Sequence, residues 1–300
     1  MEQNALDPRL LKIKMTVDDG KTTVVYDENM DIKFSCSKNI LGIQNYARIE
    51  INNITGPQRA FLLKQFNQFK LRTLKNPYMP IEVSCGRKSI RESIVYIGAS
   101  LQCAVTSPPD VGIVLTAGTQ QIDKTKWVTK WPNAGSTVHE ICQWAADTLG
   151  RHLMFSVESK VANAPIKALK IPNFGAGQWV TVDAIPMLIQ SYFPDQIAAY
   201  VDDNWLVVKD IWGVVPDLGK QEVGHGTDWP FIGIPEWTEF GIRGKVLFNP
   251  NIKLGGAIKC TSIMNPTING EYVVGKIDYE LTTRDTPFYV TFTAYPPAQP

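Results

Sequence analysis

The chain has 300 residues, of which 44% are hydrophobic and 20% charged, and its net charge is +1. These values exclude a globally disordered chain, and the lack of a basic excess argues against a protein that grips duplex nucleic acid. The five cysteines are scattered and form no Cys-x-x-Cys pair, which argues against a disulfide framework or a zinc ribbon. No apolar run approaches the ~18 residues of a membrane span, and the charged N-terminus lacks the pattern of a signal peptide. We therefore expect a globular protein made in a cytoplasm, without a membrane segment.

The first segment, residues 1–119, predicts a β domain with one helix. Asp18-Asp19-Gly20 separates two alternating runs and is typical of a hairpin turn. The predicted strands are Leu10–Val17, Thr22–Tyr26, Ile32–Ser37, Tyr46–Ile51, Pro80–Ser84, Ser93–Cys103 and Asp110–Ala117. A helix begins near Pro57, a residue that the first turn of a helix tolerates. Such a unit closes as a small barrel or sandwich with the helix packed on one side.

The predicted helix carries the only sizeable concentration of basic residues. Its members include Arg59, Lys64, Lys70 and Arg72. A solvated helix face is the simplest interpretation. A docking surface for an acidic partner is the sharper hypothesis, and a contact with nucleic acid comes third.

The middle segment, residues 120–217, predicts a small α+β domain. Thr137 and Glu140 form a capping box, apolar residues follow at helical spacing, and Gly150 suits the position after the helix. A strand, Leu153–Val157, follows. A second helix covers about 184–193 with Asp183 as its cap, and Asp202-Asp203-Asn204 then forms the turn of a hairpin.

The last segment, residues 218–300, predicts a linker and an antiparallel meander. The linker covers 213–233, which is rich in glycine and proline. The strands that follow are Arg243–Phe248, Ala257–Ile263, Glu271–Leu281 and Phe288–Tyr295, with Asn269-Gly270 as a tight hairpin turn. One face of the long strand carries Tyr272, Val274, Lys276, Asp278 and Glu280, and this face begins apolar and ends charged. Cover by another subunit and packing inside the fold both explain that pattern.

No motif in the chain predicts catalysis, a cofactor or a metal site. The stretch 213–221 has one residue too many for a phosphate-binding loop and places glutamine where a metal-binding hydroxyl is required. His139, His152 and His225 have no partner at ligand spacing. Two alternatives stay open: a peptidoglycan-degrading enzyme with a carboxylate pair, and a carbohydrate-binding module that uses exposed tryptophans. The tryptophans in question are Trp127, Trp131, Trp229 and Trp237.

The order of three segments resembles one known family. The stretches 247–255, 258–262 and 269–274 resemble the closing domain of phage baseplate hub proteins of contractile tails, with a Leu-x-Asn-Pro turn and a Gly-x-Tyr-x-Val strand. The middle segment resembles the insert of that family, and the N-terminal segment resembles its first tail-tube-like barrel. The resemblance thus implies a mainly β, α+β fold with two tube-like β-barrel or sandwich domains and a small α+β insert.

The resemblance also implies a function. Hub proteins of this kind are homotrimers in the virion, at the tail baseplate, assembled in the host cytoplasm. They form a pseudo-sixfold ring that joins the sixfold tail tube to the threefold central spike and contacts other baseplate proteins. DNA passes through the ring during ejection without sequence-specific binding. Under this interpretation the chain is not an enzyme, and the face from Tyr272 to Glu280 becomes a predicted subunit contact.

Overall fold

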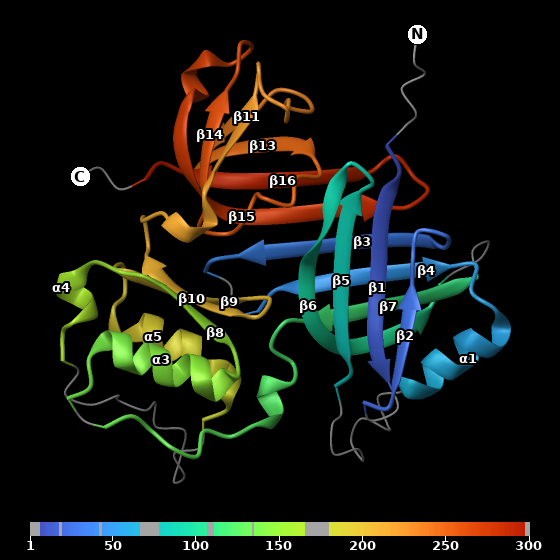
Figure 1. Cartoon of the computed structure of the whole chain (residues 1–300), viewed down its shortest axis with the longest axis horizontal. Helices are drawn as coiled ribbons and strands as arrows, with labels where there is room; N and C mark the ends of the chain where they lie inside the picture. Colours follow the sequence, from blue (N-terminus) through green and yellow to red (C-terminus); the bar gives the residue numbers. More distant parts are fainter. Residues whose placement is uncertain are drawn as a thin grey trace.

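The computed structural model describes residues 7–17, 20–41, 44–66, 78–106, 111–133, 135–165 and 180–297. Within these ranges strands dominate and three longer helices occur, so the predicted mainly β, α+β class is confirmed. Figure 1 shows three groups of elements: an N-terminal β unit, a helix-covered insert and a C-terminal β unit.

The N-terminal unit contains the predicted strands and helix. Its elements are β1 (Arg9–Val17), β2 (Thr22–Tyr26), β3 (Asp31–Asn39), β4 (Tyr46–Asn52), α1 (Gly56–Gln65), β5 (Pro80–Arg87), β6 (Ile90–Val105) and β7 (Gly112–Gly118). The hairpin of β1 and β2 is confirmed. Strict alternation in β3 and β4 sends Phe34 and Ile49 into the core, because successive side chains in a strand point to opposite faces.

The insert has a core of its own. Its elements are α3 (Val138–Leu149), β8 (His152–Ser156), α4 (Ser159–Ala162), α5 (Ile185–Tyr192), β9 (Ile197–Asp202) and β10 (Trp205–Asp210). The capping box of Thr137 and Glu140 is confirmed, and Gly150 ends α3 with a left-handed φ of 64°. Helices α3 and α5 cover one face of the three-stranded sheet (Figure 1). On the other face Tyr200 and Val207 join the main core.

The C-terminal unit completes the molecule. Its strands are β11 (Lys220–Gly224), β12 (Glu236–Thr238), β13 (Gly241–Leu247), β14 (Ala257–Thr261), β15 (Gly270–Thr282) and β16 (Phe288–Tyr295). Strand β15 pairs with β16 on one side and with β3 on the other, so both β units belong to one 13-stranded sheet. One core also continues through both units. No packing boundary therefore separates them, and the division at 119/120 and 217/218 stays a prediction.

Three local predictions are wrong. Part of the predicted linker is strand β11, which pairs in parallel with β14; a pairing that distant in the chain leaves no local signal. The cap of α5 is Ala184, because Asp183 lies inside the 3-10 turn that leads into the helix. Asn269 has an extended backbone, and a 3-10 turn at Pro266–Ile268 makes the connection before β15 instead of a tight Asn-Gly turn.

The two β units repeat one sheet. The order β12-β13-β16-β15 in the second unit corresponds to β3-β4-β7-β6 in the first, with the same antiparallel pairings. The long strands β6 and β15 each have a bulge, after Ser100 and after Val274.

Side chains follow the same repeat. Arg48 lies opposite Thr116 in the first unit, and Arg243 lies opposite Thr293 in the second. The chain therefore holds two copies of one arrangement, joined in register where β15 meets β3.

Candidate functional site

One face of the repeated sheet is open and polar. The outward side chains come from six neighbouring strands that span both β units. They are Arg243 and Lys245 of β13, Tyr289 and Thr293 of β16, Lys276, Asp278 and Glu280 of β15, Lys33, Ser35 and Ser37 of β3, Tyr46, Arg48 and Glu50 of β4, and Thr116 of β7. We call this set the open face. Most of its members are charged or carry a hydroxyl.

Most charges of the open face are paired, although its five basic side chains outnumber its three acidic ones. Lys276 Nζ lies 2.9 Å from Asp278 Oδ2, Lys245 lies 3.5 Å from Glu280, and Arg48 lies 3.6 Å from Glu50. Lys33 pairs with Asp285 at 3.1 Å, beside the end of β15. Pairs this exposed stabilise the fold little. Their consequence is a surface with only a small net positive charge.

The predicted subunit contact on β15 divides into two parts. Tyr272 and Val274 are 5% and 1% exposed within the chain, so assigning them to a subunit contact is a prediction that needs correction. Here β15 is covered on both faces by its own chain, which the alternating pattern alone did not reveal. Lys276, Asp278 and Glu280 lie on the open face, in the middle of the sheet and away from its edges.

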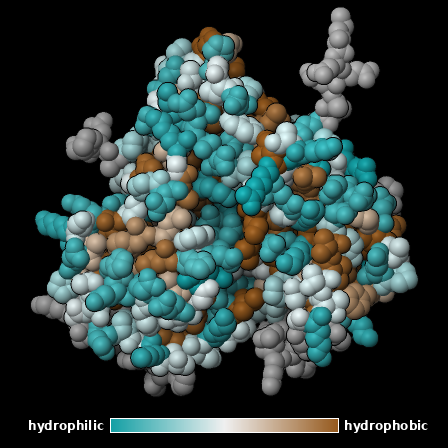
Figure 2. Space-filling model, viewed as in Figure 1, coloured by the Kyte–Doolittle hydropathy of each residue, from teal (hydrophilic) through white to brown (hydrophobic). Residues whose placement is uncertain are grey.

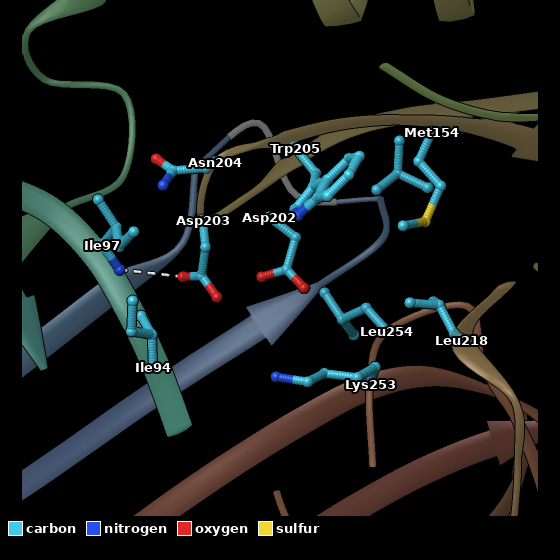
Figure 3. A pocket seen from close by; sticks show the side chains of 11 residues that line it. Ile94, Ile97, Met154, Asp202, Asp203, Asn204, Trp205, Leu218, Lys253 and Leu254 are labelled. Atoms are coloured by element: carbon cyan, nitrogen blue, oxygen red, sulfur yellow. Dashed lines mark hydrogen bonds between the residues drawn. The ribbon is translucent and has the colours of Figure 1, made fainter. Parts of the chain in front are cut away.

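A buried ion cluster joins the insert to the sheet. Lys38 Nζ donates to Asp202 Oδ1 at 2.6 Å and to Asp203 Oδ1 and Oδ2 at 3.0 and 2.9 Å. Asp203 also accepts from the backbone N–H of Ile97 on β6 (Figure 3). Lys253 of the C-terminal unit points toward the same two carboxylates, so three parts of the chain meet at this junction.

Burial and charge shift the pKa values of the junction. Burial alone would lower the pKa of Lys38, but Asp202 and Asp203 outweigh it and raise that pKa well above its usual value. Burial raises the pKa of Asp203 despite Lys38. Burial, reinforced by Lys38, lowers the pKa of Lys253. The arrangement keeps Lys38 positively charged between the two carboxylates.

A second buried lysine fastens the insert to the last strand. Lys209 Nζ lies within hydrogen-bond distance of four acceptors, the carbonyl oxygens of Asp210, Ile211 and Gly213 at 2.7–3.0 Å and the Tyr295 hydroxyl at 3.1 Å, which its three N–H donors share. Burial lowers the pKa of Lys209 to about 8. The ammonium thus ties the end of β10 to β16.

The lowered pKa of Lys209 predicts a pH effect on stability. Between about pH 8 and 10 the unfolded chain still holds a proton that the folded chain has lost, so this residue makes stability rise with pH. We expect the free energy of unfolding of the wild type, relative to Lys209→Met, to gain up to about 3 kcal/mol between pH 7 and 10. Urea unfolding at both pH values measures the gain, with the exposed Lys14→Met as control. An unchanged difference would contradict the lowered pKa.

The other predicted site residues are placed as follows. In α1, Arg59 is half-buried and Lys64 is exposed, whereas Lys70 and Arg72 lie outside the described residues. Trp131 packs against Trp144, and Trp229 against the main core. Trp237 and Trp127 are each about half exposed, and Trp237 contacts Tyr272. The docking role of α1 and the carbohydrate-binding role of the tryptophans stay untested.

Exposed apolar residues occur in both β units, and those of the C-terminal unit form two patches. Figure 2 shows a largely hydrophilic surface with separate apolar patches, one of them at the tip of that unit. Ile263 and Met264, in the loop after β14, are 62% and 75% exposed. Trp237 of β12, Phe240 just after it and Trp212 form another patch along a groove of about 760 Å³. These features suit contacts with other proteins.

No arrangement for catalysis emerges in the part of the chain that the structure describes. Within these ranges, no three His, Cys, Asp or Glu side chains are grouped to hold a metal ion. Among the same described residues, no helix is long and apolar enough to cross a membrane. The described residues instead form an open polar face, two buried lysine junctions and exposed apolar patches.

Comparison with known families identifies the chain. A family described as "Baseplate hub gp41" matches residues 10–294. The chain belongs to this baseplate hub family. The predicted family is therefore confirmed, and the family is a structural component of the phage tail. A search among curated proteins gives no match.

Solved structures agree on the fold. The chain is similar to the 43 kDa tail protein of prophage MuSo2 from Shewanella oneidensis, with 9% identity, 97% coverage of both chains and a TM-score of 0.58. It is similar to a tail protein from Neisseria meningitidis MC58, with 10% identity, 95% and 96% coverage, and a TM-score of 0.57. The E. coli c3393 protein, a type VI secretion component, shares 11% identity over 90% of this chain and 74% of its own, with a TM-score of 0.52. At these identities the similarity shows a shared fold.

Proposed function

We propose that three copies of this hub chain form a pseudo-sixfold ring that joins the sixfold tail tube to the threefold central spike. The observation that carries the proposal is the repeat of one sheet in two β units, joined in register within a single chain. Three chains with two equivalent units each supply six similar faces. Such a chain can adapt a threefold partner on one side to a sixfold partner on the other.

The open face is the candidate channel wall of this ring. It continues across both β units, and each of its three acidic side chains pairs with a basic side chain of the same face. DNA sliding through a channel requires a wall that does not hold phosphates, and a wall with little net charge meets this need. The protein thus acts as a structural part of the tail, in the virion, after assembly in the host cytoplasm.

The exposed apolar patches are then contact surfaces for neighbouring baseplate proteins. The tip at Ile263 and Met264 and the groove beside Phe240 both border the C-terminal unit. The basic helix α1 stays the candidate docking surface on the other unit. Tail tube and central spike proteins are the partners that this role requires.

A mass measurement tests the ring. We expect light scattering coupled to size exclusion to give three times the mass of one chain, either for the protein alone or after mixing with its tube and spike proteins. Because three of the five basic side chains of each open face are paired with acidic ones, we expect the trimer to bind duplex DNA weakly at physiological salt. A chain that stays monomeric beside both partners would refute the proposed ring.

A further inference from the structure

Two edges of the repeated sheet lack a neighbouring strand among the described residues. Strand β6 pairs with β5 only through Ile90–Ala99, and its last residues pair with β7 alone. Strand β12 pairs with β13 and ends the sheet. An unpaired edge presents N–H and C=O groups that accept another strand.

Each of these edges carries an apolar side chain in an unusual position. Val105 on β6 lies opposite Ile113, and Trp237 on β12 lies opposite Ile242. Both isoleucines are fully buried, so Val105 and Trp237 stand on the core side of the sheet. They are nevertheless 55% and 51% exposed. Core-side residues that remain open to solvent indicate a missing neighbour.

The chain itself shows what such a neighbour does. In the repeat, β6 corresponds to β15 and β12 corresponds to β3, and these two counterparts pair with each other inside the chain. The register of the repeat equates Val105 with Tyr279 and Trp237 with Cys36. Tyr279 and Cys36 lie opposite one another and are only 2% and 4% exposed. Pairing of the edges buries these positions.

We infer that β12 of one copy pairs antiparallel with the end of β6 in the next copy. Val105 then lies opposite the neighbour's Trp237, and Ala104 lies opposite its Thr238. The contact reproduces the β15–β3 junction, so junctions within and between chains alternate around the ring and the open face becomes continuous. This inference rests on the proposed ring and names the strands that close it. Strand β2 also ends the sheet, but it has no counterpart in the repeat.

Cysteine crosslinking tests the register. In a Cys103→Ala background, Val105→Cys with Trp237→Cys places two thiols on directly opposite residues, close enough for a disulfide. Mild oxidation should give covalent trimers on a non-reducing gel. Ala104→Cys with Trp237→Cys points the thiols to opposite faces and should crosslink at least about tenfold less. Thr23→Cys with Trp237→Cys tests the β2 edge.

The outcomes separate the contact from the ring. A mixture of the two single-cysteine chains should give covalent dimers, whereas neither single variant alone should crosslink, because the contact joins two different edges. A trimer by mass that crosslinks through Thr23, or through neither pair, overturns the inferred contact and leaves the ring intact. A chain that is monomeric with its partners refutes the ring and the contact together.

Discussion

Replacing Lys38 by methionine is expected to lower the free energy of unfolding by about 3–5 kcal/mol, because the carboxylates of Asp202 and Asp203 lose the lysine that pairs with both of them. The side chain of Lys38 is 3% exposed, and those of Asp202 and Asp203 are 14% exposed. Methionine fills a similar volume, so the loss reports charge and not packing. Chemical denaturation at pH 7 measures it.

Acid should reduce this loss. Once Lys38 is gone, burial favours the protonated form of Asp203, and its protonation removes uncompensated charge as the pH falls. In the wild type, the raised pKa of Lys38 gives the opposite signature: its contribution is full below the unfolded pKa of about 10.4 and is lost as the pH rises from there through the folded pKa. Unfolding measured from pH 5 to 8 should therefore show the deficit of Lys38→Met shrinking toward pH 5.

Two further variants control the experiment. Lys33→Met removes a lysine from the same strand whose partner, Asp285, is exposed, and it should cost less than about 1 kcal/mol. Adding Asp202→Asn and Asp203→Asn to Lys38→Met neutralises the whole cluster and should recover part of the loss. A Lys38→Met variant as stable as Lys33→Met would show that the cluster does not hold the insert to the sheet.

The sequence predicted local elements well and distant pairings poorly. The hairpin of β1 and β2, the capping box of α3 and the strands of the last unit follow from patterns within a few residues. Strand β11 was missed because its partner β14 begins more than thirty residues later and the segment is rich in glycine. The bulge in β15 could not be predicted from the sequence either, because it depends on how β15 pairs with its neighbouring strands.

The junction shows a signal that could have been used. Ile32, Phe34 and Cys36 alternate toward the core, and continuing that alternation places Lys38 on the same side. A lysine on a core face requires a buried acidic partner. Asp202-Asp203 looked like turn chemistry alone, and only the fold brings that turn to Lys38. The family resemblance implied two tube-like units, but the residue pattern did not reveal their common strand order and register, because the two units share few residue types.

The second large effect concerns the open face. We expect Glu50→Lys, Asp278→Lys and Glu280→Lys together to raise the affinity of the assembled protein for linear duplex DNA by about a hundredfold or more at low salt. The triple variant removes each acidic partner of Arg48, Lys276 and Lys245, so the candidate channel wall becomes strongly basic. Binding should weaken steeply with salt, because each phosphate contact adds about 0.9 to the slope of log affinity against log salt. Fluorescence anisotropy across a salt series measures both quantities.

Position, and not charge alone, decides this experiment. Asp147→Lys, Glu158→Lys and Asp217→Lys change the net charge equally but lie exposed on or beside the insert. On a preformed ring, a covalently closed circle cannot thread the channel, whereas a linear duplex can enter by its end. The open-face variant should therefore bind linear DNA far better than closed circular DNA, and the insert variant should bind both alike. Equal binding of both forms by the open-face variant would place this face outside the channel, because a wall that DNA reaches only by threading must discriminate between them.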